Sequence, residues 1–350
     1  MTSSIRAMRI TDNSGAGRSC CSLHDAGGRR SHDADARIRP IKRKTLAMDQ
    51  IISNISILRA APIFNLGLLI DGLLIGSIFA LAAYGLALVW GVMNVKNLAQ
   101  GDFIMIGGYL TWNLSRLGIE PLLGVPIAFV TLWGIGWLIY RAVVSKVIAR
   151  DLFTSLLATF GIAIVIQQSL NLAFGPDTQS ANADLPTWQF ANGLITVTST
   201  RLIGFVCAAV LAITVILFMK NSRIGQAIRA TAQDARAARV LGINTEKVYA
   251  FTFSLNAAIC GATGALVAVV WNVQPFMGTT YSIRLFVVVT AAGFGNLPGV
   301  IAAGFGMGVF EQFGGFILGA QYQQALIVLL LLIVLTVRQL QQLRERQAVQ

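Results

Sequence analysis

Polar and ionisable side chains that interrupt apolar stretches are the residues of this chain that offer chemistry. Each is costly inside a membrane and is therefore a candidate for a functional role. They are Asp71, Asn94, Asn97, Gln100, Asp102, Gln167, Gln168, Asn171, Asn256, Arg284, Glu311 and Gln312. Arg284 and Glu311 can pair across two helices, either on a solute path or as a purely structural ion pair. Asp71 can lie near the membrane surface.

Motifs of common catalytic sites are absent from the sequence. None of the six lysines ends a Walker A pattern, so the chain is not expected to hydrolyse ATP itself. H-E-x-x-H and G-x-S-x-G do not occur, and both histidines, His24 and His32, lie in a polar leader. Together with Cys20 and Cys21 they match no standard metal-ligand spacing. The sequence predicts no enzyme, no metal site and no cofactor of its own.

Composition places these polar groups in membrane-spanning helices. The 350 residues are 55% hydrophobic and only 12% charged, whereas soluble domains are about 25% charged. The net charge of +12 is concentrated in residues 1–47, which hold ten Lys or Arg and four Asp. Because no basic groove is interleaved with aromatic residues, nucleic-acid binding is not expected.

The polar leader, residues 1–47, lacks the apolar core of a secretory signal. At Met48 the composition changes abruptly, and a chain beginning there opens directly onto the hydrophobic body. We therefore expect Met48 to be the native start, with residues 48–350 forming one transmembrane domain.

Nine apolar segments follow one another along this domain, which predicts an all-α polytopic transmembrane bundle of eight or nine spans. A span needs about 20 residues, so the second and seventh segments are too short alone and are tilted, broken or re-entrant. The segments cover residues 66–92, 102–115, 121–141, 152–174, 201–219, 250–271, 284–294, 299–319 and 320–338.

Pairs of glycines four residues apart predict close helix packing. The pairs are Gly72/Gly76, Gly304/Gly308 and Gly315/Gly319.

Charges in the loops predict the orientation of the spans. Basic residues flank the turn at 141–150, crowd the loop 220–249 and recur in the C-terminal tail, so these parts are expected in the cytoplasm. Segment 175–200 carries Asp177 and Asp184 without a single Lys or Arg, and segment 272–283 has no charge at all. Both are expected outside.

The loop 220–249 is the longest hydrophilic stretch between spans and predicts a docking element. Its alanines, with Ile228, Val240 and Leu241, favour a short amphipathic helix, which Gly242 ends before Asn244 starts the next turn. Such a helix suits docking into a groove of a partner. The alternative is a solvated basic linker.

Three motifs, in order between about residues 66 and 338, resemble permeases of high-affinity branched-chain amino acid importers of the ATP-binding cassette (ABC) type. The first runs from Tyr84 through Asn94-Val95 and Asn97-Leu98-Ala99-Gln100-Gly101-Asp102 to Tyr109. The second is the loop, with Arg229, Gln233-Asp234, Arg236-Ala237-Ala238 and Leu241-Gly242-Ile243-Asn244. The third is Gly293-Phe294-Gly295-Asn296-Leu297-Pro298-Gly299, which leads into a helix with Glu311.

This resemblance implies a multi-pass permease subunit of the bacterial inner membrane. It also implies cytoplasmic ATPase subunits, a second similar permease and an extracytoplasmic solute-binding protein. The solutes would be branched-chain amino acids, related small amino acids or amides. The chain departs from the family where Gln100 and Asp102 replace the usual His and Glu, which leaves the solute open.

Two sets of site residues follow from the motifs. The expected solute path or gate comprises Asn94, Asn97, Gln100, Asp102, Arg284 and Glu311, although the first motif is also consistent with simple packing between spans. The expected ATPase-docking residues are Arg229, Asp234, Ala238, Gly242 and Asn244.

A rival hypothesis is an ion-coupled secondary transporter or channel that uses Asp102 and Glu311 as ion carriers. It leaves the docking-type loop unexplained and predicts a repeated half, which the sequence lacks.

Overall fold

The computed structural model describes residues 52–60, 62–148, 152–181, 187–190, 195–293 and 295–348. The chain divides into two units, Met1–Ser53 and Asn54–Gln350, and the second contains all the elements below. The expected leader and the expected start at Met48 lie outside the described residues.

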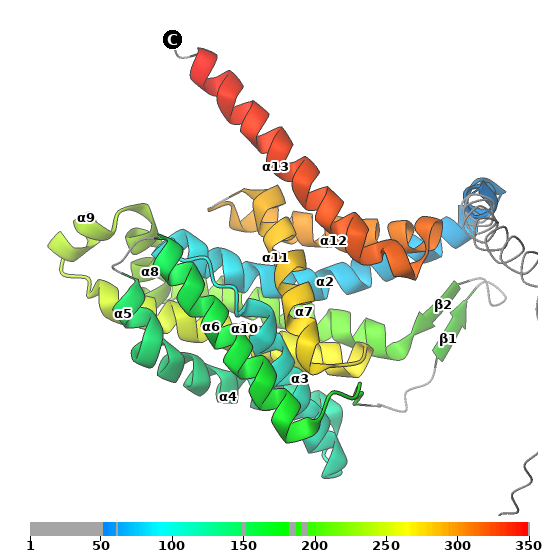
Figure 1. The fold of residues 1–350 in the computed structure, drawn as a ribbon, viewed down its shortest axis with the longest axis horizontal. Coiled ribbons are helices and arrows are strands. Elements are labelled where there is room, and N and C mark those ends of the chain that lie inside the picture. Colours follow the sequence, from blue (N-terminus) through cyan, green and yellow to red (C-terminus); the bar gives the residue numbers. More distant parts are fainter. Residues whose placement is uncertain are drawn as a thin grey trace, which may run out of the picture. The chain divides into compact units, whose positions relative to one another are not determined.

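The second unit is a helix bundle, which confirms the predicted all-α polytopic fold (Figure 1). A two-stranded antiparallel hairpin, β1 (Thr187–Phe190) with β2 (Ile195–Thr198), is the one addition among the described elements. The helices are α2 (Pro62–Met93), α3 (Gln100–Arg116), α4 (Gly124–Ile139), α5 (Ser145–Val147), α6 (Leu152–Phe174), α7 (Ser199–Asn221), α8 (Arg223–Gln233), α9 (Ala235–Val240), α10 (Thr245–Val270), α11 (Gly278–Ala292), α12 (Leu297–Leu318) and α13 (Gln323–Ala348). Short 3-10 turns precede α4, α11 and α13, and a π-helical turn, Tyr140–Val144, joins α4 to α5.

Each of the nine predicted segments contains a helix. Among the described residues, seven helices are long and apolar enough to cross a membrane. The other two are α3, with 17 residues, and α11, with 15. At 1.5 Å per residue, α11 is only about 22 Å long, shorter than the hydrocarbon core of about 30 Å. These are the two segments predicted to be too short alone.

The N-terminal ends of the two short helices meet inside the bundle. Gly101 of α3 and Gly278 of α11 lie so close that a Cβ on either would overlap the other helix. The backbone N–H of Gly101 donates to Ser282 Oγ (2.9 Å), which in turn donates to the carbonyl of Leu98 (2.9 Å). This junction satisfies backbone groups that lipid would leave unpaired.

Helices α2 and α12 form the most extensive helix contact of the bundle, and glycine makes it possible. A Cβ on Gly76 would lie 2.8 Å from the Cα of Phe305, and one on Gly308 would overlap the backbone of Gly72 and Gly76. The predicted packing pairs Gly72/Gly76 and Gly304/Gly308 are therefore confirmed, and they pack against each other.

The third predicted glycine pair does not pack a helix. Gly319 follows the end of α12 with a φ of +95°, a conformation that favours glycine, and no backbone atom of another helix lies within 4 Å of either glycine's Cβ position. The prediction for Gly315/Gly319 was wrong because the same spacing also arises where a helix ends.

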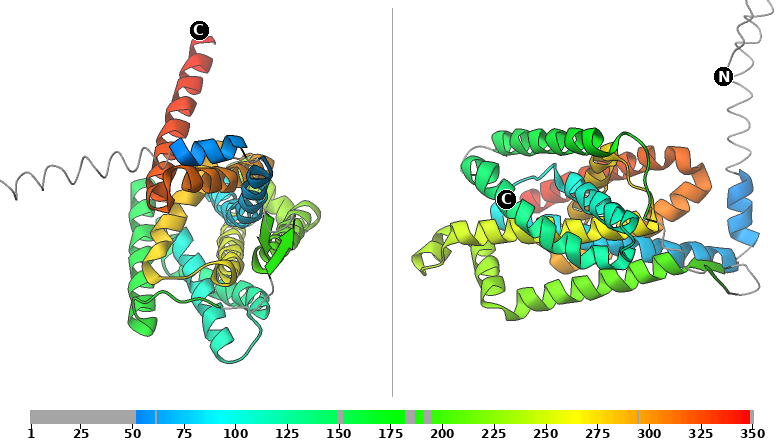
Figure 2. Two further views of the ribbon diagram at one scale, coloured as in Figure 1. Left: turned by 90° about the vertical axis from the view of Figure 1, so that its right-hand side faces the viewer. Right: turned by 90° about the horizontal axis from the view of Figure 1, so that it is seen from below.

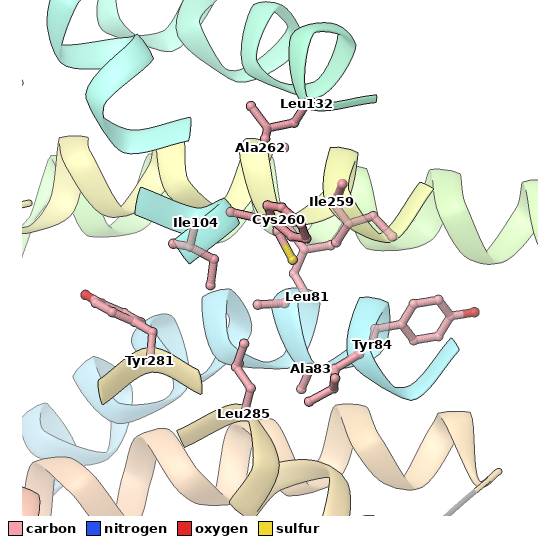
Figure 3. Close-up of a cluster of buried hydrophobic side chains, with 14 of the residues drawn as sticks. Leu81, Ala83, Tyr84, Ile104, Leu132, Ile259, Cys260, Ala262, Tyr281 and Leu285 are labelled. Carbon is pink, nitrogen blue, oxygen red and sulfur yellow. The ribbon is translucent and has the colours of Figure 1, made fainter. Parts of the chain in front are cut away.

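Helix α10 is the central element, and almost all of its membrane-depth residues are buried. Figure 3 shows Cys260 of α10 facing Leu81 of α2 from one side. Leu285 of α11 approaches α2 from the other side. All three side chains are at most 1% exposed. By contrast α13 is mostly exposed and diverges from the other helices toward its C-terminal end (Figure 1).

The two ends of the bundle collect the loops as the charge pattern predicts. At one end, Gln179 and Val273 exchange backbone hydrogen bonds (2.9 and 2.7 Å), which joins the two segments expected outside. At the other, Arg141 lies beside Asn244 and Lys247 around one cavity, which joins the two basic segments expected inside. Figures 1 and 2 show the hairpin and α9 at these opposite ends.

Candidate functional site

The segment between α7 and α10, residues 222–244, contains the candidate docking site. The predicted single amphipathic helix is in fact two helices, α8 and α9, because the chain is extended at Asp234. The Asp234 carboxylate accepts hydrogen bonds from the N–H groups of Arg236 (2.7 Å) and Ala237 (3.1 Å). Asp at this position caps a new helix, so it starts α9 and ends α8.

The other helix starts of this segment are capped in the same way. Ser222 Oγ accepts from the N–H of Gly225 at the start of α8 (2.9 Å). Asn244 Oδ1 accepts from the N–H of Lys247 at the start of α10 (3.1 Å), which confirms the predicted start there. Three side-chain caps within 23 residues fix the backbone path of the whole segment.

Gly242 ends α9, as predicted. Its φ is +84°, and its N–H donates to the carbonyl of Arg239 (3.0 Å), while the N–H of Ile243 donates to that of Ala238 (3.0 Å). These two bonds form a Schellman motif, which needs a residue in the left-handed conformation and so favours glycine.

Arg229 and Ala238, both predicted to dock the ATPase, also have a place within this chain. The Arg229 guanidinium donates to the carbonyls of Met219 and Lys220, the last turn of α7. A cation at a helix C-terminus is favourable because it faces the negative end of the helix dipole. Ala238 is only 2% exposed.

Two residues that the sequence analysis placed on the apolar face of the helix are largely exposed. Val240 is 87% and Leu241 is 79% exposed, whereas Ile228 is buried as expected. The break at Asp234 turns α9 away from the face that Ile228 buries. The Asp before a run of helix formers was the signal that would have predicted this break.

The titration of Asp234 is determined by its capping bonds. The backbone N–H groups of Ala237 and Arg236 hold the pKa of the Asp234 carboxyl below its usual value, since they bind the charged form. The cap is therefore charged at neutral pH.

The first motif forms the start of α3 and the connection from α2 that leads into it. Asn94, predicted on the solute path, is exposed and follows α2 with a φ of +52°, a position for which Asn is suited. Asn97 is fully buried, and its Oδ1 accepts from the N–H of Ala99 (3.1 Å). Both residues shape the connection between α2 and α3.

Gln100 is fully buried and joins three helices. Its Nε2 donates to Asn256 Oδ1 of α10 (2.8 Å) and to the carbonyl of Ala82 in α2 (3.3 Å), and its Oε1 accepts from Asn256 Nδ2 (2.8 Å). Reciprocal bonds between two amides leave little capacity for a solute. The geometry therefore favours the packing interpretation of the first motif at this residue.

Asp102 lies in the first turn of α3, 1% exposed, against the start of α11. Its Oδ1 accepts from Gln167 Nε2 of α6 (2.9 Å), and Gln167 also donates to Thr279 Oγ1 (3.2 Å). Its Oδ2 has no hydrogen-bond partner among the described residues. The N-terminal ends of α3 and α11 meet at this carboxylate.

Arg284 and Glu311 form the predicted ion pair, with Arg284 Nη2 2.7 Å from Glu311 Oε1. The pair joins α11 to α12. It lies on the wall of a cavity of about 260 Å³. The cavity is lined by Ile75, Phe79, Trp271, Asn272, Met277, Tyr281, Arg284, Glu311, Gln312 and Gln323.

The predicted path residues therefore fall into two places on different faces of α11. Ser282 and Thr279 face the start of α3 with Asp102, whereas Tyr281 and Arg284 face the cavity. The sequence analysis missed the aromatic walls of the cavity, since aromatic residues in apolar helices are usually ordinary packing. It also missed Arg201, which pairs with Asp71 (2.8 Å).

An all-α bundle with seven helices long and apolar enough to cross a membrane, among the described residues, is typical of a multi-pass membrane protein. Residues 68–335 match the family described as the permease component of branched-chain amino acid transport systems, and the chain belongs to this family. This confirms the family predicted from the three motifs.

Relatives of established description agree with the family. The chain is 28% identical over 285 residues to the high-affinity branched-chain amino acid transport system permease protein BraD of Pseudomonas aeruginosa, covering 77% of this chain and 92% of BraD. It is 28% identical to the corresponding permease LivH of Escherichia coli K12, with 76% and 91% covered. A probable LivH of Methanocaldococcus jannaschii is 26% identical, with 75% and 85% covered. A solved structure, PsaBC from Streptococcus pneumoniae in complex with Fab, aligns with a TM-score of 0.43 at 14% identity over 75% of this chain and 89% of that one.

Proposed function

We propose that this chain is the permease subunit of an ATP-driven importer in the bacterial inner membrane, working with a second similar permease. Two cytoplasmic ABC ATPases hydrolyse ATP, and an extracytoplasmic binding protein delivers the solute. The solutes are branched-chain amino acids or related small amino acids and amides. The names of the relatives, which are permeases of branched-chain amino acid transport systems, support this solute class.

The observation that carries the proposal is the capped segment 222–244. It projects two exposed apolar side chains, Val240 and Leu241, at the end of the bundle that collects the basic loops. Exposed apolar residues on an ordered helix end are typical of a protein interface. The neighbouring Arg236 and Arg239 are exposed as well and suit an acidic rim on the partner.

The segment is built to pass a movement on to the membrane helices. Arg229 ties α8 to the last turn of α7, and α8 also contacts α2 and α10. We propose that closure of the ATPases pushes α9, and that α8 then tilts these three helices around the solute path. Alternating access follows from such tilting of packed helices.

Uptake into vesicles tests the proposal. The chain is co-expressed with the candidate second permease, ATPases and binding protein, and uptake of radiolabelled leucine, urea and short amides is measured with and without internal ATP. Uptake that needs ATP and the binding protein and that survives an uncoupler supports the importer. ATP-independent uptake that collapses with the ion gradient would instead support the secondary transporter.

A charge placed on the docking surface tests the segment itself. Leu241→Asp is expected to reduce co-purification of the ATPases at least tenfold, because a carboxylate cannot be buried in an apolar groove without a partner. The matched control is Leu117→Asp, which changes an exposed leucine at the end of α3 in the same cap position. Equal co-purification of the ATPases with both variants would contradict docking through Leu241.

A further inference from the structure

The cavity between α2, α11 and α12 is lined by one positive and one negative side chain, and each has a polar atom without a hydrogen-bond partner. Among the residues that line it, the charged ones are Arg284, which is positive, and Glu311, which is negative. They make a single contact, between Arg284 Nη2 and Glu311 Oε1 (2.7 Å). Arg284 Nε and Glu311 Oε2 are buried and have no hydrogen-bond partner among the described residues. One N–H donor of the guanidinium and one oxygen of the carboxylate therefore lack a hydrogen-bond partner.

The guanidinium is held in place by aromatic rings rather than by further hydrogen bonds. Arg284 Cζ lies 5.3 Å from the ring centre of Tyr281 and 5.6 Å from that of Phe79. Such cation–π contacts fix the plane of the guanidinium without using its N–H groups. A structural ion pair would be expected to saturate its hydrogen bonds, because buried unpaired groups are costly.

The rest of the wall has an apolar and a polar part. Ile75, Met277 and Trp271 offer apolar surface, and Gln312 and Gln323 offer neutral amides. The volume of about 260 Å³ lies just below the range of small-molecule pockets, which begins at about 300 Å³. A small solute with a charged head and a short apolar tail fits this lining, whereas a peptide does not.

We propose that this cavity is a solute-binding site within the permease, and that Arg284 and Glu311 select zwitterions. The carboxylate of the solute binds the guanidinium of Arg284, and its ammonium group binds the carboxylate of Glu311. A neutral amide offers no charge to either group, and a solute with only one charge offers it to one of them. The proposal rests on the proposed importer function and narrows its solutes to amino acids over urea and amides.

Equilibrium binding to the permease tests this separately from transport. The full chain, in nanodiscs with its second permease and ATPases but without the binding protein, is dialysed against radiolabelled leucine. Leucinol lacks the carboxylate and 4-methylpentanoate lacks the ammonium group. Each is expected to compete at least tenfold more weakly than unlabelled leucine. This comparison uses the wild-type chain, so it does not depend on the folding of any variant.

Variants then assign the site. Arg284→Gln and Glu311→Gln are each expected to weaken leucine binding at least tenfold. The matched control is Asp71→Asn, which breaks the Asp71–Arg201 pair of similar length (2.8 Å) away from the cavity lining. It is expected to change binding less than twofold.

Three results would overturn the proposal. One is uptake of leucine by the complete transporter without saturable binding to the permease, which would leave the importer function intact. Another is equal competition by leucinol and leucine. The third is recovery of wild-type binding in the double variant Arg284→Gln/Glu311→Gln, which would show that the pair is purely structural. If the wild-type transporter shows no ATP-dependent uptake, by contrast, the importer function itself is refuted.

Discussion

At the scale of single residues, most of the predicted docking residues shape the backbone of the segment. Asp234 and Asn244 cap helix starts, Gly242 ends α9, and Arg229 caps α7. The sequence motif therefore describes the fold of the segment more than its contact surface. The proposed contact surface, Val240 and Leu241, requires only that these side chains be apolar.

Substitution of Gly242 separates the effect of backbone conformation from the effect of packing. A Cβ at Gly242 would meet no atom within 4 Å, so substitution is costly only because φ is +84°. Gly242→Ala should destabilise the segment by about 1–2 kcal/mol. Gly242→Pro should abolish ATPase stimulation and transport, because Pro cannot adopt this φ and lacks the N–H that bonds Arg239.

The matched control for this prediction is Gly118→Pro. Gly118 also follows a helix end, with a φ of +80° and an open Cβ position, but lies at the opposite end of the bundle, after α3. ATPase co-purification and stimulation, measured for both variants after confirming membrane insertion, should fall only for Gly242→Pro. Normal transport by Gly242→Pro would refute the role of this turn.

Asp234 predicts how the segment responds to acid. Its pKa is lowered by the N–H groups of Ala237 and Arg236, so its capping contribution is complete above the unfolded pKa of about 3.9. That contribution is lost as the pH falls through the lower, folded pKa. Amide exchange of residues 235–238, corrected for intrinsic rates, should show protection that decreases below about pH 4. In Asp234→Asn, which caps without a charge, protection should not depend on pH in this range.

At the scale of elements, glycine determines how closely α2 and α12 approach. Gly72 and Gly76 face Gly304 and Gly308 so tightly that backbone meets backbone. Without a hydrophobic driving force between helices in lipid, such close packing is a main source of their association. The helix pair α2/α12 carries Phe79 and Glu311 to the cavity, so its spacing also sets the width of the cavity.

Helix α12 allows a test of this close packing, because Gly304 and Gly308 face α2 whereas Gly306 does not. Gly308→Ala should destabilise the bundle by about 1–3 kcal/mol, because the added methyl would overlap the backbone of Gly76. Gly306→Ala, where a Cβ would meet nothing within 4 Å, should be neutral. Thermal unfolding of the purified complex should show a lower Tm for Gly308→Ala alone. Equal Tm values would mean that the helices separate more easily than the contact implies.

The sequence predicted the elements well and the partners of polar residues poorly. All nine apolar segments and the cap at Gly242 were predictable, because they depend on local composition and on backbone conformation. The pairing of Gln100 with Asn256, 156 positions away, depends on how helices pack and leaves no local signal. The exposure of Leu241 was mispredicted because the capping strength of Asp234 was not weighed against the helix propensity of the alanines.

At the scale of the whole molecule, the order of helices combines with the charge of the loops to predict sidedness. Both basic segments gather at one end of the bundle, and both segments free of basic residues at the other. The positive-inside rule places the first end in the cytoplasm. Helix α11 is the exception in this topology, because its 15 residues are too few for a full membrane crossing on their own.

Single cysteines in a variant without the four native ones can decide whether α11 crosses. Val240 and Gln339 are exposed and are separated by α10, α11, α12 and α13. If all four cross, Val240→Cys and Gln339→Cys react with a membrane-impermeant maleimide from the cytoplasmic side only. Thr178→Cys, one span before the docking segment, then reacts only from outside. Labelling of positions 240 and 339 from opposite sides would mean that α11 is re-entrant, since three crossings reverse the side. Because Arg284 lies on α11, that result would also place the cavity at the mouth of a re-entrant loop rather than between two spans.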